Sequence, residues 1–439
     1  MRPTFGAFFL TLVACTYPLR EQIRAGMDAA AGSTAGSQYA SPGGSYGAAG
    51  TAGFPQMGQG VDPGSAGAGA AGGASASVFG FAAGIITKAI DRSATILAGI
   101  SNGHAARWTA TTGTVTLPLP RATDDAGEAL DVSGDGWVTV GWTSTKGMPI
   151  AVRWVGVPGM PQPLGFARPG DEVSRAIAVS EDGSTVVGTS GKFLGGTLFN
   201  QATFRWKAGV MTVVEPLAGD DGTEARAVSA DASTIAGVSW SVSAHRQRVF
   251  VWNVASGIEE VGSTGAATEL DPVALSADGS VLIGDAFFGT PGFPSVTNVM
   301  ASQVFRWTHA TGTVLVTESG QMARAGGVSD DGTIIGGANS PSGFFLTSTG
   351  LHELAVPTGI LGPATSVLAP GGRALAGSGT LAGGGGNLLI LFAFDGTSVT
   401  PVSPSAAAQA MEPLPVAFSA DGHTLVANAL SGTVILSLP

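Results

Sequence analysis

The sequence predicts an all-β fold built from repeated four-stranded units, and three observations lead to this prediction. A segment of the form Ser-x-Asp-Gly recurs along residues 78 to 439. A short apolar segment that ends in Arg-Trp or Val-Trp follows most copies, and a β-rich run closes most units. The chain also has 68 glycines among 439 residues and only 12% charged residues, which argues against a coiled coil and against a charged disordered chain.

The first element of each unit combines small apolar residues, the Ser-x-Asp-Gly turn and a second apolar run. It reads A-L-D-V-S-G-D-G-W-V-T-V-G at residues 129 to 141 and A-I-A-V-S-E-D-G-S-T-V-V-G at residues 176 to 188. The serine-equivalent positions are 91, 133, 180, 229, 276, 329, 369 and 419, with spacings of 40 to 53 residues. Asp and Ser bond to nearby backbone N–H groups and Gly accepts positive φ, so the first two strands should form a tight hairpin.

Four short strands in a period of about 45 residues are the signature of a β-propeller blade. The serine-equivalent positions predict eight blades, and seven blades remain the alternative if the divergent first and last units share one. The last unit stops one strand short, after residues 433 to 438. Residues 78 to 83 are therefore expected to supply the missing strand and to close the ring.

The N-terminal segment has the features of an export signal. Residues 1–14 contain one cation, Arg2, and an apolar run from Phe5 to Ala14 that is too short to span a bilayer. Leu12-Val13-Ala14-Cys15 resembles the bacterial lipobox, which implies cleavage before Cys15 and lipidation of that cysteine. An ordinary signal peptide is the alternative. Because Thr16 and not Asp follows the cysteine, the resemblance implies an outer-membrane or cell-surface location in the bacterial cell envelope.

The predicted domain order follows from composition. Residues 15–27 form the lipidated N-terminus, which a membrane would hold through the acyl chains on Cys15. Residues 28–77 are expected to be a flexible linker, since 35 of these 50 residues are Gly, Ala or Ser. Residues 78–439 form the propeller.

The repeats also resemble a known family. The stretch A-T-F-R-W-K-A-G-V-M-T-V-V-E-P-L-A-G-D-D-G-T-E-A-R-A-V-S-A-D-A-S-T-I-A-G at residues 202 to 237 resembles the bacterial extracellular HAF-type repeat. It is also similar to the Ser-x-Asp-Gly propeller repeats of Tol-system periplasmic proteins. The His-Ala-Phe motif itself survives only as His104-Ala105-Ala106. The resemblance implies a propeller at the cell exterior and implies no particular activity.

The Arg-Trp pairs and the turn aspartates are interpreted as a structural repeat. Adjacent residues of a middle strand face opposite sides, and neighbouring blades cover both sides, so these tryptophans should pack between blades. The arginines would be partly buried cations that need partners, and we hypothesise repeated Arg-to-Asp contacts. A sugar-stacking surface and an anion pocket are the alternatives. The residues concerned are Arg107, Trp108, Arg153, Trp154, Arg205, Trp206, Trp252, Arg306, Trp307, Asp135, Asp182, Asp231, Asp278, Asp331 and Asp421.

The loop before each inner strand is the candidate ligand or cation rim. It carries Asp124, Asp125, Asp171, Glu172, Asp220, Asp221, Glu224 and Asp271. In a propeller this loop opens on the face around the central channel, so these carboxylates could surround one mouth. Ca²⁺ is a possible ligand because it accepts carboxylate and carbonyl oxygens. No other cofactor is evident, and the alternative is that the carboxylates only keep the surface soluble.

The sequence favours binding over catalysis. The five histidines occupy different places in different units, and there is no Gly-x-Ser-x-Gly elbow or P-loop. We expect a monomeric, exported, lipid-anchored binding or scaffold module for a protein or polysaccharide partner. A polysaccharide-processing hydrolase or lyase that uses the channel mouth is the alternative. The net charge of -11 argues against a nucleic-acid partner, and the single cysteine excludes a disulfide framework.

Overall fold

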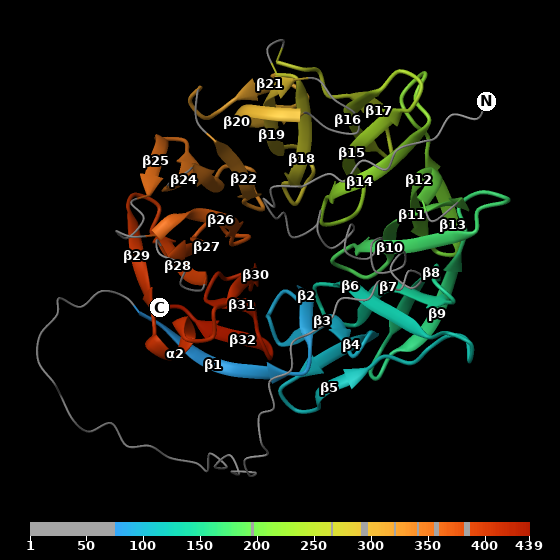
Figure 1. Cartoon of the computed structure of the whole chain (residues 1–439), viewed down its shortest axis with the longest axis horizontal. Coiled ribbons are helices and arrows are strands. Elements are labelled where there is room, and N and C mark those ends of the chain that lie inside the picture. The colour runs from blue at the N-terminus through green and yellow to red at the C-terminus, as the bar shows by residue number, and fades with distance from the viewer. Residues whose placement is uncertain are drawn as a thin grey trace, which may run out of the picture.

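The computed structural model describes residues 75–194, 197–264, 267–290, 297–319, 322–339, 342–354, 360–381 and 387–439. The predicted signal peptide, Cys15 and most of the predicted linker lie outside this part of the chain. The described strands form four-stranded antiparallel sheets that surround a central axis (Figure 1). There are eight such blades, which confirms the prediction of an eight-bladed propeller. Strand β1 (Ser75–Ala83) also pairs in parallel with β29 (Val399–Pro404) at two residues, which joins the sheets of the last two blades.

The chain runs from the innermost to the outermost strand in each of the first seven blades. Blades 1 and 2 contain β2 (Ile86–Ile90), β3 (Ile96–Ser101), β4 (His104–Thr109) and β5 (Gly113–Thr116), then β6 (Ala126–Val132), β7 (Val138–Thr145), β8 (Met148–Val155) and β9 (Met160–Gly165). Blades 3 and 4 contain β10 (Val173–Val179), β11 (Thr185–Leu194), β12 (Thr197–Lys207) and β13 (Val210–Val214), then β14 (Gly222–Val228), β15 (Thr234–Ser241), β16 (Arg246–Asn253) and β17 (Gly257–Glu260).

The remaining blades follow the same order. Blades 5 and 6 contain β18 (Glu269–Leu275), β19 (Leu282–Thr290), β20 (Thr297–Thr308) and β21 (Gly312–Leu315), then β22 (Ala323–Val328), β23 (Ile335–Asn339), β24 (Ser342–Thr347) and β25 (Gly350–Leu354). Blade 7 contains β26 (Ile360–Leu368), β27 (Ala374–Leu381), β28 (Asn387–Phe394) and β29 (Val399–Pro404), and a short helix, α2 (Ala406–Gln409), follows it. Blade 8 contains β30 (Leu414–Phe418), β31 (Thr424–Ala429) and β32 (Gly432–Ser437).

Strand β1 (Ser75–Ala83) completes the eighth blade. It pairs antiparallel with β32 and is the outermost strand of that blade (Figure 1). Its Ala76 is buried among residues of blades 7 and 8, and the Ala76 carbonyl accepts a hydrogen bond from Ser405 N at 2.9 Å. The N-terminal segment therefore closes the ring as predicted. The strand begins at Ser75 and not at Val78, because Ser77 also pairs with β32, and Ser75 and Ala76 pair with β29 of blade 7.

The Ser-x-Asp-Gly segment forms the hairpin between the first two strands. In blade 3, Ser180 Oγ donates to Asp182 Oδ1 at 2.6 Å and accepts from Thr185 N at 3.0 Å. Asp182 Oδ1 also accepts from Ser184 N at 2.9 Å, and Gly183 has φ 69°. The hydroxyl and the carboxylate thus satisfy the turn's backbone donors, and glycine supplies the left-handed conformation.

The second residue of each Ser-x-Asp-Gly copy belongs to a ring of backbone hydrogen bonds around the axis, which we call the collar. The N–H of this residue donates to the carbonyl of its counterpart in the next blade, as from Gly134 to Glu181 at 3.0 Å. The collar residues are Arg92, Gly134, Glu181, Ala230, Ala277, Asp330, Pro370 and Ala420, and seven of the links are present at 2.7 to 3.1 Å. The link from Pro370 to Ala420 is missing because proline has no N–H.

A repeated glycine on the second strand lets the first and second strands of one blade approach closely. A Cβ added at Gly188 would lie 2.2 Å from the Arg175 carbonyl oxygen and 2.4 Å from Phe204 Cζ. The same carbonyl position in the inner strand crowds five further glycines, namely Gly99, Gly141, Gly237, Gly284 and Gly337. The glycine in the sequence repeat is therefore required by sterics between the first and second strands.

Candidate functional site

The first aspartate of three acidic loops anchors its own loop to the second strand of the blade. Asp124 accepts from Thr143 Oγ1 at 2.9 Å, Asp171 from Ser190 Oγ at 2.6 Å, and Asp220 from Ser239 Oγ at 2.8 Å. These hydroxyl residues occupy the same repeat position, two residues after the strand glycine. The pKa of Asp124 lies below its usual range because hydrogen bonds from Arg121, Thr145 and Thr143 outweigh the effect of burial.

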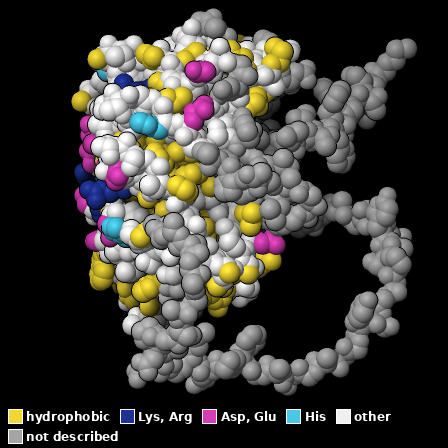
Figure 2. Space-filling model, turned by 90° about the vertical axis from the view of Figure 1, so that its left-hand side faces the viewer, with side chains coloured by type: hydrophobic (Ala, Val, Ile, Leu, Met, Phe, Trp, Pro, Cys, Tyr) yellow, Lys and Arg dark blue, Asp and Glu magenta, His cyan; other side chains and the backbone are white. Residues whose placement is uncertain are grey.

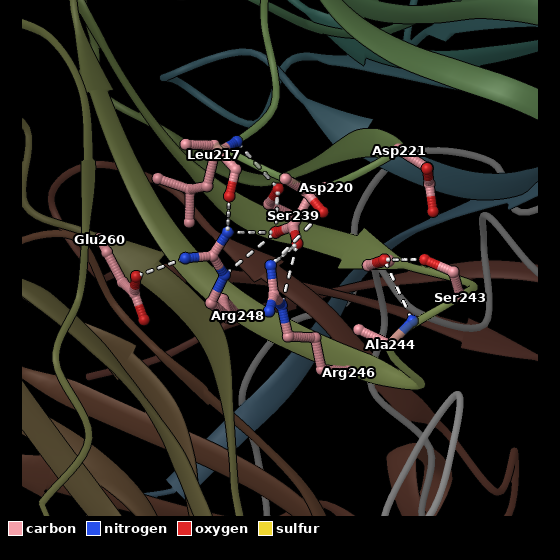
Figure 3. Close-up of polar contacts among 12 residues, drawn as sticks. Leu217, Asp220, Asp221, Ser239, Ser243, Ala244, Arg246, Arg248 and Glu260 are labelled. Carbon is pink, nitrogen blue, oxygen red and sulfur yellow. Dashed lines mark hydrogen bonds and ion pairs between the residues drawn. The ribbon is translucent and has the colours of Figure 1, made fainter.

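Asp220 forms the most extensive of these networks, in blade 4 (Figure 3). Its side chain is fully buried and accepts from Arg246 Nε at 3.1 Å and from Arg248 Nε at 3.1 Å. Arg248 also donates to Glu260 at 2.7 Å and to the Ala218 carbonyl at 3.0 Å. Figure 3 shows both guanidinium groups directed at Asp220. The network ties the acidic loop to β16 and β17.

The other rim residues are spread over the loops and the inner strands. Asp125 accepts from Lys146 N at 2.9 Å and the exposed Asp221 accepts from Val242 N at 2.7 Å, while Glu172 is exposed. Glu224 pairs with Arg226 at 2.9 Å on β14, and Asp271 is buried on β18. Within the described residues no group of three or more His, Cys, Asp or Glu side chains is placed to hold a metal ion. Several of the carboxylates that were candidate Ca²⁺ ligands accept hydrogen bonds from other groups of the protein. In the described part of the chain they do not form a Ca²⁺ site.

Arg107 and Arg205 donate to turn carbonyls and not to the predicted turn aspartates, although the charges of Asp91 and Asp135 act on Arg107. Arg107 of blade 1 is buried and donates to the Gly136 carbonyl at 2.5 Å and to the Gly156 carbonyl at 3.3 Å, both in blade 2. Arg205 likewise donates to the carbonyl of Ala232, the glycine-equivalent residue of the next turn, at 2.7 Å. The reason is that the turn carboxylate already accepts from serine and backbone donors, whereas the carbonyl at the end of the turn is free for the neighbouring blade.

The turn aspartates themselves are structural acceptors in the described part of the chain. Asp135, Asp182, Asp231, Asp278, Asp331 and Asp421 each accept from the serine of the same turn at 2.5 to 2.9 Å. The serine bond holds the pKa of Asp182 below its usual range, with the Ser184 amide as the next cause.

The tryptophans of the Arg-Trp pairs contact the preceding blade. Trp154 is fully buried among residues of blades 1 and 2, and its Nε1 donates to the Pro118 carbonyl at 2.8 Å. Trp307 is buried against blade 4, while Trp108, Trp206 and Trp252 are half-buried in the equivalent clusters. Arg153 lies 4.8 Å from the ring centre of Trp206, and burial lowers its pKa. The fourth arginine of the set, Arg306, is half-buried on β20 and pairs in register with Ile283.

Charged residues on the inner strands link neighbouring blades. Lys88 of blade 1 pairs with Glu128 of blade 2 at 3.1 Å, and both side chains are largely buried. Arg175 of blade 3 lies 5.0 Å from the ring centre of Trp142, and burial lowers its pKa while Glu128 opposes that change. This belt of inner-strand charges was not foreseen as a set. Glu128 and Arg175 share one repeat position but have opposite charges, and Lys88 comes from another position.

Two buried aspartates interrupt the repeat in blade 5. Asp271 and Asp285 are directly opposite each other on β18 and β19, with exposed fractions of 3% and 0%. Asp285 accepts from Ala325 N at 2.8 Å and lies 3.6 Å from Arg324 Nη1 of blade 6. Burial raises the pKa of Asp285 to about 7, although Arg324 opposes the rise. This pairing was not predicted, and its one trace in the sequence is that Asp285 stands where other blades carry an uncharged residue.

Three collar side chains meet across the axis, and the sequence analysis missed all three. Arg92 of blade 1 bonds to Glu181 of blade 3 and, through Nη2, to Asp330 of blade 6 at 3.3 Å. Because the collar encircles the axis, contacts between members that are not neighbours cross its interior. Figure 2 shows several Lys, Arg, Asp and Glu side chains along the left-hand edge of the molecule. In the sequence, the one indication of these contacts is that the second residue of three Ser-x-Asp-Gly copies is charged.

Comparison with known proteins supports the fold. No protein-family model matches the chain, and no curated protein matches it significantly. The C-terminal WD40 domain of Sif2 is 13% identical with a TM-score of 0.52, and the match covers 84% of this chain and 100% of that domain. Oligogalacturonate lyase from Vibrio parahaemolyticus is 11% identical with a TM-score of 0.45, over 70% of this chain and 88% of the lyase.

The fold and the repeated turns define the class: the chain is a β-propeller protein. Within that class it is an eight-bladed propeller whose N-terminal strand completes the last blade. In the part of the chain that the structure describes, no helix is long and apolar enough to cross a bilayer.

Proposed function

We propose that this propeller is an exported binding or scaffold module, held at the bacterial cell envelope by a lipid on Cys15. The observation that carries the proposal is the position of β1. The strand that closes the ring is the segment that follows the predicted tether, so a lipid anchor at the N-terminus would connect through β1 to a closed, eight-bladed platform. Such a platform can present one face to a protein or polysaccharide partner while the tether gives it reach.

The charges on the blades support a structural platform. Arg107, Asp220 and Asp182 each form several bonds within the protein, and these bonds join turns, loops and neighbouring blades. Preorganised surfaces bind with a smaller loss of conformational entropy. A rigid ring with exposed turns between its strands therefore suits recognition.

The lipid anchor is tested by comparing the full chain with a Cys15→Ser variant in a bacterial host that is fed radioactive palmitate. We expect the full chain to incorporate label and to sediment with the outer membrane, and the variant to lose both properties. An unlabelled full chain that is released in soluble form would contradict the anchor. Release of reducing ends from polysaccharides by the purified protein would favour the hydrolase or lyase instead.

A further inference from the structure

Trp137 breaks the repeat at the residue that follows the Ser-x-Asp-Gly turn. The seven equivalent residues are Thr95, Ser184, Ser233, Ser280, Thr333, Arg373 and His423. Trp137 is 56% exposed, unlike Trp154, which is fully buried. Exposed tryptophan carries a large apolar surface whose burial by a partner is favourable.

The backbone on both sides of this indole is fixed. Trp137 N donates to Asp135 Oδ1 at 2.9 Å, and the Trp137 carbonyl accepts from Gly156 N at 2.9 Å. Arg107 lies beneath and donates to the carbonyls of Gly136 and Gly156. The buried guanidinium therefore holds together the two turns that flank the ring.

The ring rests on a glycine and extends into a small apolar surface. A Cβ at Gly156, which has φ 86°, would lie 3.4 Å from Trp137 Cζ2. Val157 follows Gly156 in the turn and is 63% exposed, and Met160 begins β9 directly after the turn and is 74% exposed. We call the three exposed side chains Trp137, Val157 and Met160 the indole platform.

The exposed charge beside the indole platform is negative, while Arg107 is buried. Asp135 is exposed, precedes Trp137 by two residues and feels the charge of Asp182 of the next blade. On the side of blade 1, Ile96 lies close to Gly136, the residue before Trp137. The Asp135 carboxylate thus stands beside a small apolar centre of only three exposed side chains.

We propose that the indole platform binds one sugar ring of a neutral polysaccharide, stacked on Trp137. A sugar ring offers an apolar C–H face to the indole, and the Asp135 carboxylate beside the indole can accept hydrogen bonds from the hydroxyl groups at the edge of the sugar. The carboxylates and the chain's net charge of -11 disfavour an acidic polymer. A stable protein interface needs about 800 Å² on each partner with an apolar centre, more than three side chains supply. The assignment rests on the proposed binding function and names its ligand class.

The test is affinity electrophoresis of the full, detergent-solubilised chain in gels that contain mixed-linkage β-glucan, dextran, mannan or, as an acidic comparison, alginate. We expect at least one neutral polymer to retard the wild type. Trp137→Ala should weaken that binding about tenfold or more, as for loss of a central aromatic anchor, and Trp137→Phe should retain part of it. Val210→Ala is the matched control, because Val210 is 66% exposed and begins the outermost strand of blade 3 as Met160 does in blade 2.

Thermal melts of all variants distinguish lost binding from lost folding, and the exposed position of Trp137 should leave the melting temperature unchanged. Unaltered retardation of Trp137→Ala would overturn the platform while leaving the propeller a polysaccharide-binding module. Absence of retardation by every neutral polymer would overturn the sugar assignment. The membrane anchor is measured separately by palmitate labelling, so either failure can be recognised by itself.

Discussion

Arg92 Nη2 and Asp330 Oδ2 lie 3.3 Å apart although their residues belong to the first and sixth blades. Arg92 also pairs with Glu181 of the third blade, so one guanidinium joins three blades that are not neighbours in the ring. Burial raises the pKa of Asp330, and the charge of Arg92 opposes the rise. This contact crosses the collar and ties the two halves of the ring together at that end of the axis.

Loss of Arg92 should lower the free energy of unfolding by a small amount that depends on salt concentration. Arg92→Ala leaves Glu181 and Asp330 close together without their cation, but all three side chains are 44% to 48% exposed. We therefore expect a loss of about 1 kcal/mol or less in the free energy of unfolding. Urea denaturation should show the loss at low salt and little of it in 1 M NaCl, and adding Glu181→Gln and Asp330→Asn should remove the salt dependence. A salt-independent loss of several kcal/mol would contradict this account.

Asp220 should matter for stability whether or not Ca²⁺ is present. Asp220→Asn leaves Arg246 and Arg248 facing each other without the buried carboxylate, and we expect a loss of about 3 kcal/mol. Asp221→Asn is the matched control, since Asp221 is exposed and accepts one backbone bond. Thermal melts in EDTA and in millimolar Ca²⁺ measure both variants. A stabilisation by Ca²⁺ that Asp220→Asn removes would show that the loop is a cation site after all.

Gly188 should not tolerate a methyl group. Gly188→Ala would place Cβ 2.2 Å from a carbonyl oxygen of β10, so strand or side-chain shifts costing about 3 kcal/mol are expected. Gly262→Ala provides the comparison, because a Cβ there meets no atom within 4 Å. Denaturant midpoints should fall for the first variant and stay near the wild-type value for the second. Equal midpoints would mean that β10 and β11 are less closely packed than described.

Asp285 should make stability fall as pH rises from about 4 to about 7. Its pKa in the folded protein is about 7 against 3.8 in the unfolded chain, so the folded state keeps a proton that the unfolded state loses in this range. The groups that face it are Asp271 and Arg324. Asp131 also has a pKa of about 7, so the measurement is the difference between wild type and Asp285→Asn in unfolding free energy at each pH. A difference that does not change with pH would refute the assignment.

Ala208 offers a stabilising change. It is exposed and has φ 50° in the hairpin between β12 and β13, where Gly209 follows with φ 85°. The hairpin between β3 and β4 of blade 1 has Asn102 and Gly103 with similar φ values. Ala208→Asn should therefore stabilise the protein by about 1 kcal/mol, seen as a higher melting temperature. An unchanged or lower melting temperature would show that the turn differs from the one described.

Most of the fold could be predicted from the sequence repeat. The Ser-x-Asp-Gly spacing predicted the blades and the hairpins, and the short last unit predicted closure by the N-terminal strand. These features depend on contacts within a unit or on a missing unit, and both can be seen in a sequence. The bonds of Arg92 could not be predicted, since they join residues 89 and 238 positions apart at a variable site of the repeat.

The acidic loops show the same limit. Asp220 was recognised as a candidate, but its partner Arg246 lies 26 residues later on a strand whose register the sequence did not reveal. The Arg-to-Asp hypothesis chose the correct turn and the wrong atoms, because charge complementarity alone does not show that Asp135 already accepts from Ser133 and from Trp137 N. The sequence shows that Trp137 lies outside the Arg-Trp pattern, but the exposure of its side chain could be learned only from the structure.

The most direct test of the central claim, a rigid ring locked around its axis, is hydrogen exchange of the collar amides by mass spectrometry or NMR. We expect slow exchange at the amides of Arg92, Gly134, Glu181, Ala230, Ala277, Asp330 and Ala420, including the closing link from Ala420 N to the Arg92 carbonyl. Fast exchange at the Ala420 amide, with protection of the other collar amides, would mean that the ring opens between blades 8 and 1 and is not locked around its axis.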